Sequence, residues 1–166
     1  MNFTDPCVFG DTISPDDIEQ GQLGNCYFVS VLSSMAASPE RVRSMFDTQE
    51  FNEAGIYLLK LYINGILTPV IVDDYVPCVD GKRFTKETAF VNRKDGILWA
   101  SLVEKAWAKL HGTYARVEGG QSSIVMNHLS GLPTKQIVHK EVVDYDDYWE
   151  KLKFATKRQF KMIASA

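Results

Sequence analysis

Cysteine is scarce in this sequence, and patterns typical of metal sites are missing. Three cysteines, Cys7, Cys26 and Cys78, stand far apart along 166 residues. An odd number at wide spacing argues against a disulfide framework and predicts a reducing, intracellular (cytoplasmic) setting. The sequence has neither a Cys-x-x-Cys nor a His-Glu-x-x-His pattern, so we expect no zinc site.

Long apolar runs and clustered basic residues are also missing. No stretch approaches the ~20 apolar residues that cross a bilayer, so we expect no transmembrane segment. Residues 1–6 lack the basic and apolar regions of a signal peptide. The 18 Lys and Arg residues are scattered and the net charge is −3, which argues against nucleic-acid binding. The length fits one domain, or one domain and a small piece.

Hydrophobic periodicity and turn residues predict a mainly helical α+β fold. Apolar spacings of three and four predict helices from Asn25 to about Ala37 and from Leu98 to Leu110. The pair Asn64-Gly65 between two β-branched runs predicts a hairpin of residues 55–63 and 66–72. Shorter helices are expected at residues 14–17, 38–46, 122–129 and 146–159, the last capped by Asp146, and residues 161–164 are compatible with the start of a strand.

Cys26 is expected to be the first residue of the first long helix. A helix N-terminus carries about half a positive charge and unpaired N–H groups, which favour a thiolate. Gln20, upstream in the segment Gln20-Gly21-Gln22-Leu23-Gly24-Asn25-Cys26, could direct its amide at an oxyanion beside the Cys26 N–H. This order of residue types indicates a thiol nucleophile. The alternative is a small buried cysteine at the head of an apolar helix.

The stretch from Asp17 to Phe28 resembles the catalytic-cysteine motif of calpains, the papain-like intracellular cysteine endopeptidases. Further likenesses follow in the family's order, at residues 3–6 (Phe-Thr-Asp-Pro), 72–77, 98–114 and 119–120. The resemblance implies a papain-like left-hand subdomain at residues 1–140, which bears the cysteine, is built round a central helix starting at Cys26 and includes a small β-hairpin. Residues 141–166 would then be the truncated start of a second, histidine-bearing subdomain.

The resemblance also implies the roles of individual residues. Cys26 matches the nucleophile, Gln20 matches the oxyanion-hole glutamine, and Gly119 and Gly120 match part of the substrate-binding cleft. A protein or peptide is the implied substrate. Asn25 and Tyr27 depart from the family, which has Asp and Trp at these two positions.

Calcium is a further implication of the resemblance. The family's first subdomain binds Ca²⁺ through a carboxylate that matches Asp17 and a glutamate just before the Trp-centred helix. The second position falls at about Ile97, and an isoleucine side chain offers no oxygen to a cation that takes about six to eight oxygen ligands. Asp17 is therefore the one candidate calcium ligand that the resemblance implies, in a site that lacks its second carboxylate.

The catalytic histidine of the family has no counterpart in its usual context. Papain-like proteases carry it ~130–150 residues after the cysteine, beyond His111, His128 and His139. The family's Asn-Pro-Trp-Gly segment is also missing. We therefore expect the nucleophile-bearing half of a calpain-like cysteine endopeptidase, inactive alone. The alternatives are a non-catalytic calpain-like binding or regulatory module and an unrelated scaffold with a buried cysteine.

Overall fold

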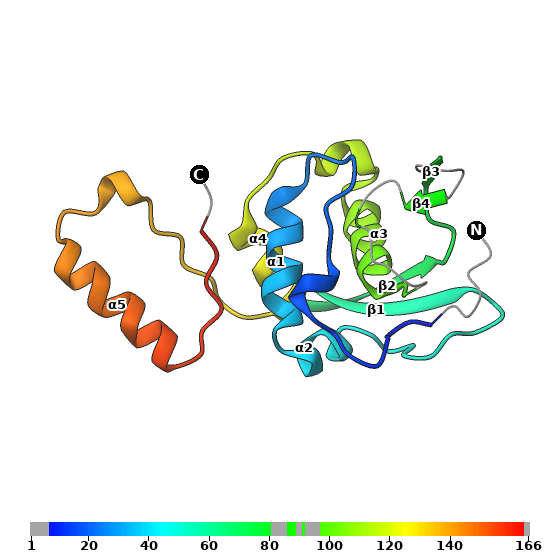
Figure 1. Cartoon of the computed structure of the whole chain (residues 1–166), viewed down its shortest axis with the longest axis horizontal. Coiled ribbons are helices and arrows are strands. Elements are labelled where there is room, and N and C mark those ends of the chain that lie inside the picture. Colours follow the sequence, from blue (N-terminus) through cyan, green and yellow to red (C-terminus); the bar gives the residue numbers. More distant parts are fainter. Residues whose placement is uncertain (1–6, 81–85, 89–90, 92–96, 165–166) are drawn as a thin grey trace.

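The computed structural model describes residues 7–80, 86–88, 91 and 97–164, and within them the chain forms a mainly helical α+β unit with an outlying helix. Figure 1 shows α1 in the middle of this unit, with α4 beside it, the hairpin β1–β2 next to α3, and α5 apart at one end. The elements of the main unit are α1 (Cys26–Ala36), α2 (Pro39–Ser44), β1 (Ile56–Ile63), β2 (Ile66–Asp73), α3 (Trp99–His111) and α4 (Ser122–Ser130). The predicted fold class is confirmed.

Shorter elements connect these. They are η1 (Pro15–Asp17), β3 (Cys78–Asp80), β4 (Lys86–Thr88), η3 (Tyr114–Val117) and η4 (His139–Glu141). Strands β3 and β4 pair antiparallel with each other. The family-like residues 3–6 lie outside the described residues.

Helix α1 is the central helix of the core. Its buried residues include Phe28, Val31, Leu32 and Met35, and their steps of three and four put them on one face. The ring of Phe28 stacks on Trp107 of α3, with 5.8 Å between the ring centroids. The helix begins at Cys26, as the apolar spacing predicts, and its first buried residues, Phe28 and Val29, follow within the first turn.

The hairpin forms where Asn64-Gly65 predicts it. Both residues have positive φ, 52° and 77°, as a two-residue hairpin turn of type I′ requires. Tyr57, Leu59, Leu61, Val70 and Val72 point into the core. Pro69, paired with Lys60, lies on β2, which has β1 as its one partner strand among the described residues. The expected edge position of this proline is therefore confirmed.

Two glycines end the helices that pack on α1. Gly112 follows α3 with φ 96°, and Gly131 follows α4 with φ 69°. Positive φ is accessible to glycine at little cost, which is why the helices stop there. Trp99 and Trp107 are buried on α3, so the apolar stripe predicted for this helix is its core face.

The C-terminal helix α5 (Tyr145–Lys157) is capped two residues earlier than predicted. Asp144, not Asp146, is the N-cap: its carboxylate accepts hydrogen bonds from the backbone N–H groups of Asp146 and Asp147, both at 3.0 Å. The predicted helix is therefore right in type and shifted by a residue or two. Residues 161–164 form no strand; Ile163 instead packs against the core.

Candidate active site

The loop that leads to Cys26 is held by a single carbonyl. The side-chain Nε2 of Gln20 donates to the carbonyl oxygen of Leu23 at 2.8 Å, and the backbone N–H of Asn25 donates to the same oxygen at 2.8 Å. The side chain of Leu23 is buried in the core. The chain therefore enters α1 from an anchored turn rather than from a free loop.

Cys26 is exposed and its thiol is free. The N–H groups of Phe28 and Val29 donate to the backbone carbonyl of Asn25, at 2.8 and 3.1 Å. The earliest N–H groups of a helix have no intrahelical partner, and the first turn of α1 holds no acidic residue. Because Cys26 is exposed at a helix N-terminus, the alternative of a small buried cysteine is wrong.

The amide of Gln20 is held in the turn just before Cys26 by a hydrogen bond to the carbonyl of Leu23. Its bond to Leu23 was not predicted from the sequence. A primary amide carries two N–H groups, so this bond uses one donor and fixes the direction of the other. Gln20 is exposed, and its second donor is the one that a substrate oxygen could meet.

Gly119 and Gly120 pack against the segment around Cys26, the first residue of α1. The N–H of Gly119 donates to the carbonyl of Gly24 at 2.9 Å. A Cβ placed on Gly120 would stand 2.5 Å from the ring of Tyr27. Residues far apart in the sequence thus meet at one edge of α1, and only a residue without a side chain fits at position 120.

Tyr27 holds this edge to α3. Its hydroxyl accepts a hydrogen bond from Nε1 of Trp107 at 3.1 Å and donates one to the carbonyl of Val117 at 3.0 Å. Burial raises the pKa of Tyr27, against the opposing effect of the Trp107 hydrogen bond. The tyrosine thus keeps its proton and bridges the residue after Cys26 to two other segments.

Asn25 forms the contact that sequence reasoning missed. Its Nδ2 donates to Oε1 of Glu104 at 2.6 Å, and the second carboxyl oxygen accepts from the N–H of Val91 at 3.0 Å. Both Asn25 and Glu104 are buried. The sequence held a signal for this contact: Ala100 and Ala108, one turn before and after Glu104, are small and apolar. An acidic residue between them on the same helix face indicates a buried carboxyl group.

Comparisons with known proteins decide the family. The profile of the family described as "Calpain family cysteine protease" matches residues 2–166. The chain belongs to the calpain family of cysteine proteases. Its relatives include a calpain-type cysteine protease DEK1 from Arabidopsis thaliana, 39% identical over 126 residues, which are 76% of this chain and 6% of that protein.

Animal calpains are also similar. Calpain-5 of Caenorhabditis elegans is 34% identical over 134 residues, and calpain-5 of Mus musculus is 35% identical over 136 residues. Each match covers 76% of this chain and about a fifth of the relative, 20% and 21% respectively. This calpain-family chain therefore spans a small part of the length of its relatives.

The three histidines of this calpain-family chain contact other groups than Cys26. Nδ1 of His111 lies 2.9 Å from the carbonyl of Trp107, and the rings of His111 and His128 lie 4.2 and 5.5 Å from the Trp107 ring. Burial, and next the charge on His111, lower the pKa of His128. His139 contacts Tyr148. The structure gives none of them a contact to the thiol.

The expected calcium ligand lies only partly in view. The backbone of Asp17 belongs to η1, and its side chain lies outside the described part of the chain. Ile97 forms an isolated bridge with Cys7. Among the described residues, no group of three or more His, Cys, Asp or Glu side chains is arranged to hold a metal ion. Calcium binding through Asp17 stays a prediction.

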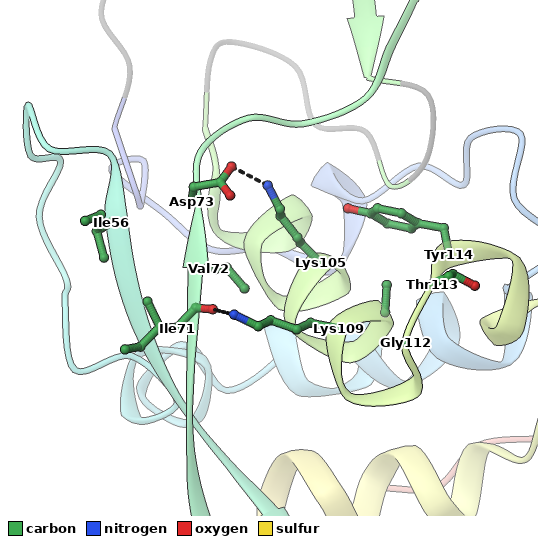
Figure 2. Close-up of a pocket in the computed structure, with 10 residues that line it drawn as sticks. Ile56, Ile71, Val72, Asp73, Lys105, Lys109, Gly112, Thr113 and Tyr114 are labelled. Atoms are coloured by element: carbon green, nitrogen blue, oxygen red, sulfur yellow. Dashed lines mark hydrogen bonds and ion pairs between the residues drawn. The ribbon is translucent and has the colours of Figure 1, made fainter.

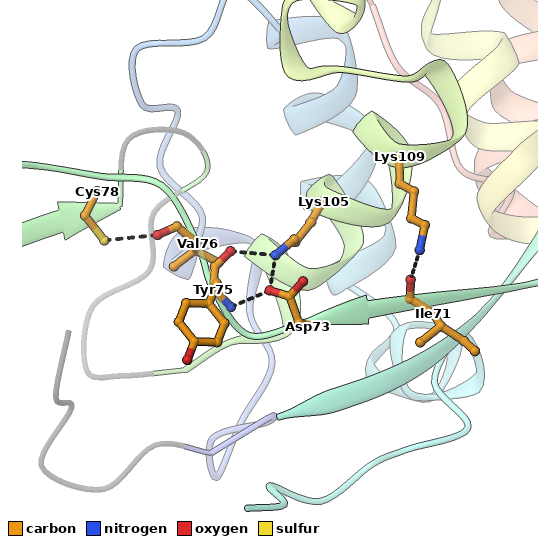
Figure 3. A network of polar contacts seen from close by, with 7 residues as sticks. All are labelled: Ile71, Asp73, Tyr75, Val76, Cys78, Lys105 and Lys109. Carbon is orange, nitrogen blue, oxygen red and sulfur yellow. Dashed lines mark hydrogen bonds and ion pairs between the residues drawn. The ribbon is translucent and has the colours of Figure 1, made fainter. Parts of the chain in front are cut away.

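A pocket of about 460 Å³ lies away from Cys26, between β2 and α3 (Figure 2). Lys105 and Lys109 reach across it to β2. Figure 3 shows Nζ of Lys105 donating to Oδ1 of Asp73 and to the Tyr75 carbonyl, both at 2.5 Å, and Nζ of Lys109 donating to the Ile71 carbonyl at 2.7 Å.

The Lys105 hydrogen bond is the main cause that holds the pKa of Asp73 below its usual range. Lys105 and Lys109, both on α3, thus hydrogen-bond to the β2 side of the hairpin. A lysine laid along an edge strand also keeps other strands from pairing with it. We therefore regard these two lysines as structural and the pocket as separate from the chemistry of Cys26.

Proposed function

We propose that this chain is the nucleophile-bearing half of a calpain-like cysteine endopeptidase, with Cys26 as the nucleophile. The observation that carries the proposal is the place of Cys26. It is an exposed thiol on the first residue of a helix. The turn closed by the Gln20–Leu23 hydrogen bond leads into it, and the Gly119–Gly120 segment packs against that turn. Thiolate character and exposure are what a reactive cysteine needs.

The proposed reaction is acyl transfer. A histidine takes the proton of Cys26, and the thiolate attacks the carbonyl carbon of a peptide bond. The carbonyl oxygen becomes an oxyanion, which accepts hydrogen bonds from the Cys26 N–H and the second Nε2 hydrogen of Gln20. The intermediate expels the amine, which takes the proton from the histidine, and water then releases the acyl group from sulfur.

We propose that the histidine belongs to a second subdomain, with residues 1–140 forming the first and residues 141–166 beginning the second. Two observations support this. The three histidines in this chain are engaged with other groups, and α5 stands apart from α1–α4 (Figure 1). The segment around α5 also exposes large apolar side chains, namely Val143, Tyr145, Trp149, Phe154 and Phe160, which a further subdomain would cover.

A non-catalytic calpain-like binding or regulatory module is the second candidate. The same histidine contacts favour it, since a binding module needs no base near Cys26. Such a module needs no reactive thiol either, so the reactivity of Cys26 separates the two candidates.

The test uses an N-acylated peptide p-nitrophenyl ester, whose leaving group needs no acid catalyst. We expect the chain alone to be acylated at Cys26 and to turn over no faster than acyl-thiol hydrolysis. Added imidazole should raise the turnover rate, because it replaces the missing base. A Cys26→Ala variant should lose both effects, and a Cys78→Ala variant should keep them. If the ester reacts equally with Cys26→Ala and the unchanged chain, the proposal is wrong.

A further inference from the structure

Glu104 is an acidic residue in the middle of the core. It lies on α3 and is 2% exposed. Among the described residues, no lysine or arginine forms an ion pair with it. Burying a carboxylate without a cation costs folding free energy. Its hydrogen-bond partners must therefore offset this cost.

Both oxygens of Glu104 have a backbone or side-chain donor. Oε1 accepts from Nδ2 of Asn25 at 2.6 Å, and Oε2 accepts from the N–H of Val91 at 3.0 Å. Ser101 donates to the carbonyl of Val91 at 3.1 Å, so Val91 is held from two sides. The carboxyl group therefore joins α3, the Val91 segment and the residue immediately before Cys26.

Asn25 does not act as an ordinary N-cap. An asparagine at this position usually accepts a hydrogen bond from an N–H of the first turn. Asn25 makes no such side-chain bond, and its Oδ1 is buried with no partner among the described residues. Its side chain is turned toward Glu104 instead, which leaves the positive end of α1 to act on Cys26.

We propose that Glu104 is a positioning residue for Cys26: it holds Asn25 by a buried hydrogen bond, and its charge state sets how readily the Cys26 thiol reacts. The proposal rests on the proposed function, in which Cys26 is the nucleophile. A neutral carboxylic acid leaves the field at the N-terminus of α1 positive. An ionised carboxylate opposes the thiolate.

The surroundings allow this change of charge near neutral pH. Burial raises the pKa of Glu104 to about 7, against the opposing hydrogen bonds of Val91 and Asn25. Of the described groups packed around it, α1 carries no Asp, Glu, His, Lys or Arg side chain, and its titratable groups are Cys26 itself and Tyr27. Lys105 is paired with Asp73. Tyr114 has its pKa raised by burial first, and then by the charges of Glu104 and Asp73, so it stays neutral in this range.

The experiment measures the rate at which iodoacetamide alkylates Cys26 between pH 5.5 and 9. Mass spectrometry of peptides separates Cys26 from Cys7 and Cys78, so Cys78 is an internal control. In the unchanged chain, we expect the Cys26 rate to rise less steeply around pH 7 than a single ionisation allows. The Cys78 profile should show no such change of slope around pH 7.

Glu104→Gln removes the charge and keeps the shape of the side chain. The ratio of its Cys26 rate to that of the unchanged chain should rise from about 1 at pH 6 to about threefold at pH 8, because only the ionised carboxylate opposes the thiolate. Glu118→Gln, which removes an exposed charge next to Gly119, is the matched control and should leave the ratio near 1 at every pH.

Two results overturn the proposal. One is a Glu104→Gln profile that superimposes on that of Glu118→Gln. The other needs no variant: a Cys26 profile in the unchanged chain that fits one ionisation. Either result leaves the proposed function intact if Cys26 still reacts faster than Cys78. A Cys26 that reacts no faster than Cys78 contradicts the proposed function itself.

Discussion

The N–H of Gly119 donates a hydrogen bond to the carbonyl of Gly24, 2.9 Å away, and so joins two segments that the sequence separates widely. The contact places the Gly119–Gly120 segment against the turn that leads to Cys26. Gly120 then lies on the ring of Tyr27, the residue after Cys26. The chain's candidate cleft wall and candidate nucleophile are therefore parts of one packed unit.

Gly120→Ala should disturb this unit, because the new Cβ would stand 2.5 Å from a Tyr27 ring that two hydrogen bonds hold in place. Overpacking of this kind costs about 1–3 kcal/mol of unfolding free energy. Urea denaturation measures the loss. Gly24→Ala is the control, since a Cβ there would meet nothing within 4 Å. Equal stability of the two variants would contradict the packing described.

Tyr27→Phe should destabilise the fold without changing its shape. The variant leaves Nε1 of Trp107 and the carbonyl of Val117 without their partner, and an unsatisfied buried polar group costs about 1–3 kcal/mol. Tyr75→Phe removes a hydroxyl from a side chain that is 84% exposed and should change the unfolding free energy by less than about 0.5 kcal/mol. A loss of similar size in both variants would argue against the Tyr27 bridge.

Most helix and strand boundaries could be predicted because their signals are local. Gly112 and Gly131 stop helices through their own backbone conformation, and Asn64-Gly65 makes its turn through two residues. The role of Glu104 could not be predicted in this way. Its partners, Asn25 and Val91, are 79 and 13 positions away, and only the packing of α3 on α1 brings them together.

The candidate site was predictable in part for the same reason. The position of Cys26 at the head of α1 follows from the apolar spacing after it. The bond from Gln20 to the Leu23 carbonyl depends on how a turn closes, and the two residue types do not by themselves predict it. The predicted N-cap of α5 was wrong because Asp144, Asp146 and Asp147 can all cap a helix. Which of them does so depends on the backbone conformation of the residues that lead into α5.

The stability of the fold should fall as Glu104 ionises. Its folded pKa of about 7 lies above the unfolded value of 4.5, so the folded state holds this proton more tightly. The stabilisation is fully present below pH 4.5 and is lost as the pH rises to 7, a loss of about 3 kcal/mol. Glu104→Gln should lack this dependence.

Urea denaturation of the unchanged chain and of Glu104→Gln from pH 4.5 to 8 measures this effect as a difference. Asp73 and His128 also titrate with shifted pKa values, but they do so in both proteins and cancel. A difference in unfolding free energy that stays constant with pH would show that Glu104 does not change its charge in this range.

Gln20→Ala should slow the acylation of Cys26 by the p-nitrophenyl ester about 100-fold, because the loss of one oxyanion donor costs ~2.7–4 kcal/mol. Stopped-flow release of p-nitrophenolate measures the rate. Gln22→Ala, a change of an exposed glutamine in the same turn, is the control and should leave it within about twofold. Since Gln20 also holds Leu23, circular dichroism has to show that the variant is folded. A folded Gln20→Ala chain with an unchanged rate would remove Gln20 from the oxyanion hole.

The nucleophilic role of Cys26 is tested most directly by trapping the acyl group. The chain is mixed with the peptide p-nitrophenyl ester, quenched in acid and digested, and the acylated residue is located by mass spectrometry. We expect a burst close to one equivalent of p-nitrophenolate per chain and an acyl group on Cys26, with Cys7 and Cys78 unmodified. An acyl group spread over the three cysteines, or a burst that survives Cys26→Ala, would contradict the nucleophilic role of Cys26.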